Sequence, residues 1–212
     1  GYPKHFHLCP PGSNVQQNQR EQMKIIKFRN TGNPEELEID VIPDSAIQKN
    51  GKPFFVPDFA SRFQFSAAAA VHVCRLGKNI AQRFANRYYE EAGLCLVFEA
   101  KDLLDTLNAN GKPRALATSF DASHIVGEMT PTDIAMLGKN TATLEINGED
   151  TEKFTLPSAA DFDKCIATAS RYFTLKIGDL ILIENGEWHN AEINSRVTAR
   201  LGDFESINIK IK

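Results

Sequence analysis

The chain has 212 residues, a formal net charge of -3 and 42% hydrophobic residues. This length and composition suit one domain with a continuous core. Basic residues do not gather into a patch of the kind that binds nucleic acid, and the apolar runs are shorter than the roughly 18 to 20 residues needed to span a membrane. We therefore expect a cytoplasmic protein that binds neither nucleic acid nor a membrane.

Residues 1–22 are polar and lack the apolar centre of a signal peptide, so we expect an N-terminal extension there and one folded domain over 23–212. His5, His7 and Cys9 have a spacing that metal ligands use, but a metal site needs more ligands and a held geometry. The cysteines are far apart and form no C-x-x-C pair, which predicts free thiols. They are Cys9, Cys74, Cys95 and Cys165.

The first half of the domain alternates apolar stretches with breaks. Strands are expected at 23–29 and 37–42, and an extended segment interrupted by two prolines at 52–59. A further apolar strand is expected at 94–98. The helix after it should end at the glycine of 108–111, because glycine accepts the left-handed conformation that commonly closes a helix.

The last third contains clear turn and cap signals. Residues 141–156 predict a hairpin with Asn147 and Gly148 at its turn. Ser158, followed three residues later by an aspartate, predicts the start of a helix that runs to about Arg171. Gly178 and the following aspartate indicate a tight turn into a buried strand. The tail alternates apolar and polar residues, which predicts a half-buried edge strand or pair of strands.

Four segments stand in an order and spacing that resemble the fumarylacetoacetate hydrolase superfamily, close to 2-hydroxyhepta-2,4-diene-1,7-dioate isomerase and acylpyruvase-like proteins. The resemblance covers nearly all of 23–212. It implies a mainly β (α+β) fold, a mixed β-sandwich roll with a few short helices, and a homodimer. It also implies Mg2+-dependent cleavage, decarboxylation or isomerisation of oxo- and hydroxydienoic acids. The segments are Arg75-Leu76-Gly77-Lys78-Asn79-Ile80, the frame 98–103, Ser119-Phe120-Asp121-Ala122-Ser123, and 174–181 (TLKIGDLI).

Residues 62–75 are the stretch where propensity and resemblance disagree. The run of alanines at 67–70 favours a helix by propensity, whereas the resemblance implies a strand followed by a helix at 81–92. In active members this strand carries Glu-x-Glu and the next strand carries an Asp. Carboxylates at i and i+2 share one strand face and hold Mg2+ or Mn2+ through oxygen. The matching residues here are Ser66, Ala68 and Val97, so we expect no metal and no other cofactor.

Other residues that carry chemistry in the family are also replaced. The lysine that polarises the substrate falls on Thr118, and a second pocket lysine is replaced by Ile42. The His of the lid is missing from the segment after Arg29, where Glu35, Glu36 and Glu38 indicate a solvated turn. The Gly-Thr-Pro loop that binds the substrate carboxylate reads Glu184-Asn185-Gly186-Glu187, whose acidic side chains would repel an anionic oxo acid.

Four residues remain as weak candidates. Glu99 shares the strand face of Val97 and is able to supply one displaced ligand. Asp102 is interpreted as a structural residue at a helix start, and Asp121 as a capping residue in a turn. His124, beside an apolar run, is more typical of a structural histidine.

Two main hypotheses follow. The first is a pseudoenzyme, a family member without metal or activity, that serves as a binding or regulatory subunit, as a homodimer or paired with an active relative. The second is an active metal-dependent hydrolase, isomerase or decarboxylase that uses a displaced carboxylate set drawn from Glu99, Asp102, Asp121 and Glu128. A third reading is a plain scaffold whose function lies in residues 1–22.

Overall fold

The computed structural model describes residues 23–29 and 38–212. The expectations for residues 1–22, including His5, His7 and Cys9, and for the lid segment at 30–37 lie outside the described residues. Within the described residues, no helix is both long and apolar enough to cross a membrane. The three cysteines among them, at positions 74, 95 and 165, are free thiols, as the spacing predicted.

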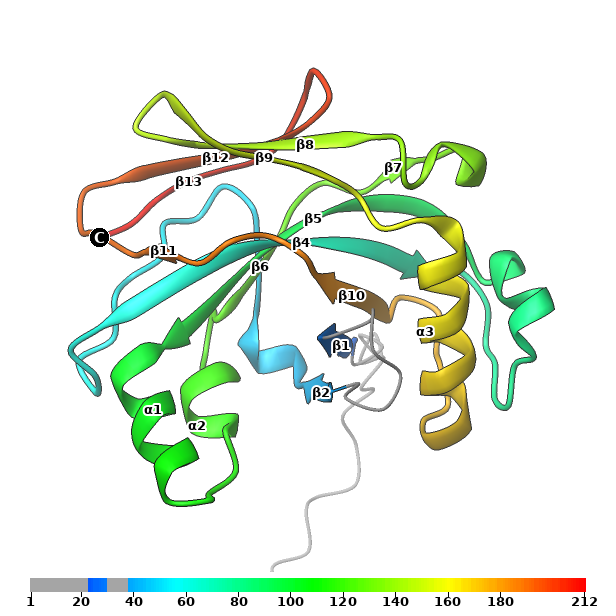
Figure 1. Cartoon of the computed structure of the whole chain (residues 1–212), viewed down its shortest axis with the longest axis horizontal. Helices are drawn as coiled ribbons and strands as arrows, with labels where there is room; N and C mark the ends of the chain where they lie inside the picture. Colours follow the sequence, from blue (N-terminus) through cyan, green and yellow to red (C-terminus); the bar gives the residue numbers. More distant parts are fainter. Residues whose placement is uncertain (1–22, 30–37) are drawn as a thin grey trace, which may run out of the picture.

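The chain folds into two β-sheets that face each other (Figure 1). The larger sheet contains β1 (Ile25–Arg29), β2 (Glu38–Ile42), β3 (Ile47–Lys49), β4 (Phe63–Val73), β5 (Tyr89–Ala100), β6 (His124–Val126), β7 (Thr130–Pro131), β10 (Leu180–Glu184) and β11 (His189–Asn190). Its order is β2-β1-β10-β4-β5-β6-β3, with β11 beside β4 and β7 beside β5. This mainly β architecture confirms the fold class expected from the sequence.

The smaller sheet has the order β13-β12-β8-β9 and lies across the larger sheet (Figure 1). Its strands are β8 (Thr141–Ile146), β9 (Glu149–Thr155), β12 (Arg196–Leu201) and β13 (Phe204–Lys210). The hairpin β8–β9 turns at Asn147 and Gly148, both at positive φ, as their sequence predicted. The C-terminal tail forms the predicted strand pair, because β12 pairs with β13 in antiparallel register.

Three α-helices flank the sheets. They are α1 (Lys101–Ala109), α2 (Ala115–Thr118) and α3 (Ala159–Tyr172), with short 3-10 helices η1 (Asp44–Ala46), η2 (Gln82–Arg87) and η3 (Ile134–Met136). The start of α3 is the predicted capping box: the side chain of Ser158 accepts from the backbone of Asp161, and the Asp161 side chain accepts from the backbone of Ser158. Figure 1 shows α3 at one end of the larger sheet and α1 with α2 at the other.

The expected helix at 81–92 is wrong. Residues 82–87 form only the short helix η2, and β5 already begins at Tyr89. Tyr89 is 1% exposed, and its hydroxyl donates to a carboxylate oxygen of Asp163 on α3 at 3.1 Å. Extending β5 also pairs Ala92 with Val71 of β4. Burial of the tyrosine ring and these strand pairs outweigh local helix propensity.

The strand at 62–75, by contrast, forms as the resemblance implied. Side chains alternate along β4, so Phe65, Ala67 and Ala69 enter the core between the two sheets. Ser66, Ala68 and Ala70 alternate with them and face the opposite side of the larger sheet, where the two alanines pack with Ile42 of β2 and Val97 of β5. That second face carries the candidate site.

Candidate functional site

The three positions that the sequence resemblance matched to the family's metal ligands lie next to one another. Ser66 on β4 is the register partner of Val97 on β5, and Ala68 follows two residues after Ser66 on the same face. All three are buried, with exposures of 1% or less. The fold therefore brings together the positions that the sequence singled out.

These side chains do not fit a divalent metal. Mg2+ and Mn2+ take hard oxygen donors, preferably carboxylates, and this set offers one hydroxyl, one methyl and one isopropyl group. The Ser66 hydroxyl already donates to the carbonyl of Ala67 at 3.3 Å. Within residues 23–29 and 38–212, no group of three or more His, Cys, Asp or Glu side chains is arranged to hold a metal ion.

A buried lysine from β1 lies on this same face. Lys27 is 0% exposed, and its Nζ atom lies 3.1 Å from Oε1 of Glu184 and 3.9 Å from Oδ2 of Asp40. Glu184 ends β10 and is the register partner of Ala68. The positive charge of Lys27 therefore lies beside the family metal position and is balanced by carboxylates of this chain. A dication placed there would be repelled by the ammonium group.

Arg29 extends this charged cluster toward β5. Its Nε lies 2.7 Å from Oε2 of Glu184, and its Nη2 lies 3.7 Å from Oε2 of Glu99. The other oxygen of Glu99 accepts a hydrogen bond from the side chain of Gln64. Burial raises the pKa of Glu99, and Gln64 and Arg29 offset part of that rise. Glu99 does share the face of Val97, but its partners are an amide and a guanidinium group.

His124 closes the cluster on β6. It is fully buried and is the register partner of Val97, and its Nδ1 lies 3.0 Å from the hydroxyl of Ser123. Burial lowers the pKa of His124 well below 6.5, and the charges of Lys27 and Arg29 lower it further. The imidazole is therefore neutral at physiological pH.

The other sequence candidates lie elsewhere or make structural bonds. Asp102 accepts from the backbone N–H groups of Ser61 and Leu103 at 2.9 and 3.0 Å at the start of α1. The hydroxyl of Thr118 donates to the carbonyl of Arg114. Asp121 is exposed, and Glu128 is exposed on the segment that follows β6. The displaced carboxylate set is thus not gathered around Glu99.

Two residues of the charged cluster were not among the candidates drawn from the sequence. Arg114, which precedes α2, reaches β2 and pairs with Glu38 at 2.8 Å and with Asp40 at 3.6 Å. Lys27 stands in an apolar strand, where a lone lysine is commonly solvent-facing. The one signal in the sequence was that a lysine stands within an otherwise apolar strand. Its partner, Glu184, is evident only from the position of β1 beside β10.

Comparison with known proteins agrees with the fold. No protein-family model matches the chain. The bovine (Bos taurus) mitochondrial oxaloacetate tautomerase FAHD1 is 27% identical over 173 residues, which cover 81% of this chain and 78% of the bovine protein.

Two solved structures share the architecture. The fumarylpyruvate hydrolase of Pseudomonas aeruginosa, in complex with Mn2+ and pyruvate, superimposes with a TM-score of 0.75 at 17% identity, covering 98% of this chain and 100% of that one. The 2-hydroxyhepta-2,4-diene-1,7-dioate isomerase of Mycobacterium marinum gives 0.75 at 20% identity, covering 90% of this chain and 74% of that one.

The two facing sheets of this chain form the fold that these solved structures share. In sequence the chain resembles the fumarylacetoacetate hydrolase superfamily, through its similarity to oxaloacetate tautomerases. Its relatives include hydrolases, isomerases and tautomerases, and one of them holds Mn2+.

Proposed function

We propose that this protein does not perform the metal-dependent chemistry of its superfamily and acts instead as a non-catalytic binding or regulatory member. One observation carries the proposal. The face that should hold a dication carries Ser66, Ala68 and Val97, and the charged groups beside them neutralise one another.

Electrostatics gives the physical reason. The superfamily reaction develops negative charge on an enolate or oxyanion, and a bound metal stabilises that charge by several kcal/mol. Here the nearest cations, Lys27 and Arg29, are already paired with Glu184. Freeing either cation would break one of the two ion pairs of the buried Glu184 carboxylate, and breaking a buried pair costs about 3 kcal/mol or more.

The test is a pair of measurements on the full chain. Titration calorimetry with Mn2+ and with Mg2+ should show no binding at the outer face. Conversion of enol-oxaloacetate to its keto form, followed by ultraviolet absorbance, should run at the uncatalysed rate with and without either metal. Metal-dependent turnover that is lost in Glu99→Gln would overturn the proposal and support the displaced-carboxylate enzyme.

A tautomerase of oxaloacetate is the second candidate, because that is the activity named for the bovine relative. Glu99 and Glu184 are the carboxylates of this face that such a reaction would need. The two candidates also differ in their partners. Co-purification with an active relative supports a regulatory subunit, whereas a homodimer with measurable turnover supports the enzyme.

A further inference from the structure

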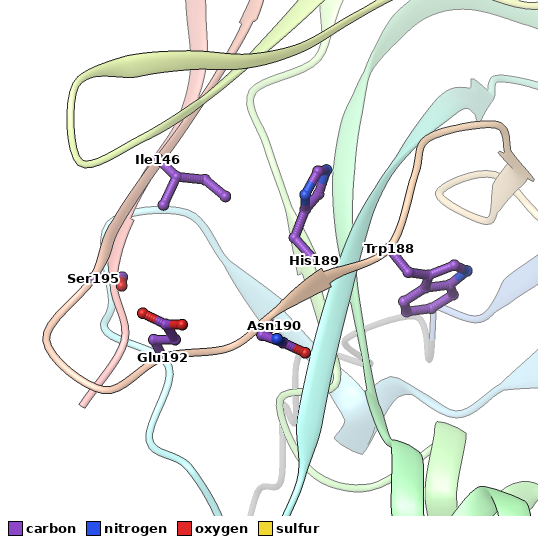
Figure 2. Close-up of a pocket in the computed structure, with 6 residues that line it drawn as sticks. All are labelled: Ile146, Trp188, His189, Asn190, Glu192 and Ser195. Atoms are coloured by element: carbon purple, nitrogen blue, oxygen red, sulfur yellow. The ribbon is translucent and has the colours of Figure 1, made fainter.

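A pocket lies along β11, and its lining residues come from β11, the end of β8 and the segment that leads to β12 (Figure 2). Its volume is about 360 Å3, and its opening lies where β11 approaches the end of β8. The ring of His189 packs at 5.9 Å from the ring of Phe65, which belongs to the core between the sheets. The pocket is lined by Ile146, Trp188, His189, Asn190, Glu192 and Ser195.

The imidazole in this pocket is held in one orientation. Nε2 of His189 lies 3.0 Å from Oε2 of Glu152 on β9, and Oε1 of Glu152 accepts the backbone N–H of Glu187 at 2.8 Å. The side chains of His189 and Glu152 are 15% and 7% exposed. With the proton placed on Nε2, where the carboxylate accepts it, Nδ1 is left as a hydrogen-bond acceptor.

The one carboxylate among the described residues that line the pocket is that of Glu192, and the hydroxyl of Ser195 is able to donate or accept. The side chain of Asn190 points to the opposite side of β11 from His189 (Figure 2). Of the described residues that line the pocket, none is a lysine or an arginine. An anion would meet the charge of Glu192 with no lysine or arginine to offset it, whereas an ammonium group brings three N–H donors and a positive charge.

We propose that this pocket binds a small molecule with a protonated primary amine, with Glu192 as the counter-charge and Nδ1 of His189 as a second acceptor. This pocket is thus expected to prefer a cation, whereas a site for oxo acids prefers an anion. This preference depends on Glu192 and His189, neither of which belongs to the charged cluster of the outer face, so it stands whether or not that face is catalytic. Ile146 supplies an apolar wall for a short alkyl chain.

Three probes of equal chain length isolate the charge of the head group: n-butylammonium, n-butanol and butyrate. The backbone amide resonances of His189, Asn190 and Glu192, which line the pocket, are the reporters in a 15N-correlated NMR spectrum. The indole N–H of Trp188, the single tryptophan of the chain, packs against the outer face of the larger sheet and serves as an internal control. We expect n-butylammonium to shift the three amide resonances saturably. Butanol should bind more weakly, and butyrate should cause no saturable shift.

The variant Glu192→Gln should weaken n-butylammonium binding by about threefold or more, the size expected for a part-exposed ion pair, and leave butanol unchanged. Glu192 is exposed, so the variant should keep its fold, which circular dichroism checks. Glu128→Gln, an exposed glutamate outside the pocket, is the matched control and should bind as the native chain does. Equal affinity for butyrate and n-butylammonium, shifts confined to residues outside the pocket, no saturable shift, or an unchanged affinity in Glu192→Gln would each overturn the proposal.

Discussion

The Nζ atom of Lys27 lies 3.1 Å from Oε1 of Glu184, on the face of the sheet that also carries Ala68 and Val97. Lys27 is fully buried and Glu184 nearly so, with a side-chain exposure of 10%. A buried pair of this kind stabilises the fold little in net terms, but loss of one partner is costly. Neither charge is therefore easily lost, and the pair sets the charge on this part of the sheet face.

The first prediction concerns this pair. Lys27→Met should lower the free energy of unfolding by about 3 kcal/mol, because it leaves a buried carboxylate short of a partner. Glu184→Gln should do the same to the ammonium group. The double variant should lose less than the sum of the two single losses, by about 1 kcal/mol or more. Urea unfolding of the four proteins measures the difference, and strictly additive losses would show that the two charges do not interact.

The second prediction concerns rebuilding a metal site. Replacing Ser66 and Ala68 with Glu and Val97 with Asp restores three carboxylates on one face. We expect this triple variant to bind Mn2+ in titrations followed by electron paramagnetic resonance, and to bind it more tightly when Lys27→Met is added. The physical reason is the repulsion between the ammonium group and the dication. Equal Mn2+ affinity with and without Lys27 would refute that role for the lysine.

The third prediction concerns His124 and acid stability. Its pKa is lowered in the folded protein by burial and by two nearby cations, and it returns to about 6.5 on unfolding. Below pH 6.5 the unfolded chain therefore binds a proton that the native chain does not. This loss of stability should grow by up to about 1.4 kcal/mol per pH unit. His124→Gln should flatten this part of the stability curve between about pH 5 and pH 6.5, measured by urea unfolding.

The fourth prediction concerns Glu99, whose contribution to stability changes with pH in the opposite direction. Burial raises the pKa of Glu99 in the folded protein, so the native chain holds a proton that the unfolded chain releases once the pH exceeds the ordinary value of 4.5. The contribution of Glu99 to stability should fall as the pH rises from 4.5 through the raised pKa. Glu99→Gln keeps an oxygen for the Gln64 side chain and removes the titration. Its stability relative to the native chain should therefore increase over that pH window; an unchanged difference would contradict the assignment.

The fifth prediction concerns the loop that stands in place of Gly-Thr-Pro. The N–H of Gly186 donates to the carbonyl of Ala67 at 3.1 Å, and a Cβ atom at this position would lie 2.5 Å from that oxygen. Gly186→Ala should therefore push the loop away from β4 and cost about 1 to 3 kcal/mol in thermal or urea unfolding. Asn185→Ala, next to it, removes only one exposed side-chain bond and should cost less.

Local patterns were sufficient for most of the fold. The capping box at Ser158, the turn at Asn147 and Gly148, and the alternation of the tail are each made by neighbours in the chain, and each formed as predicted. The helix expected at 81–92 did not form. A contact between residues far apart in the sequence, Tyr89 and Asp163 on α3, stabilises an extended strand instead.

The sequence by itself determined which residues the resemblance matches to the family ligand positions, because that match follows from motif spacing along two long strands. The tertiary structure alone decided what surrounds Ser66, Ala68 and Val97. Lys27 meets Glu184, and Arg29 meets Glu99, because β1 inserts beside β10 and brings distant segments together. Charge pairing depends on separation in space, and strand order sets that separation in a way that no single stretch of sequence records.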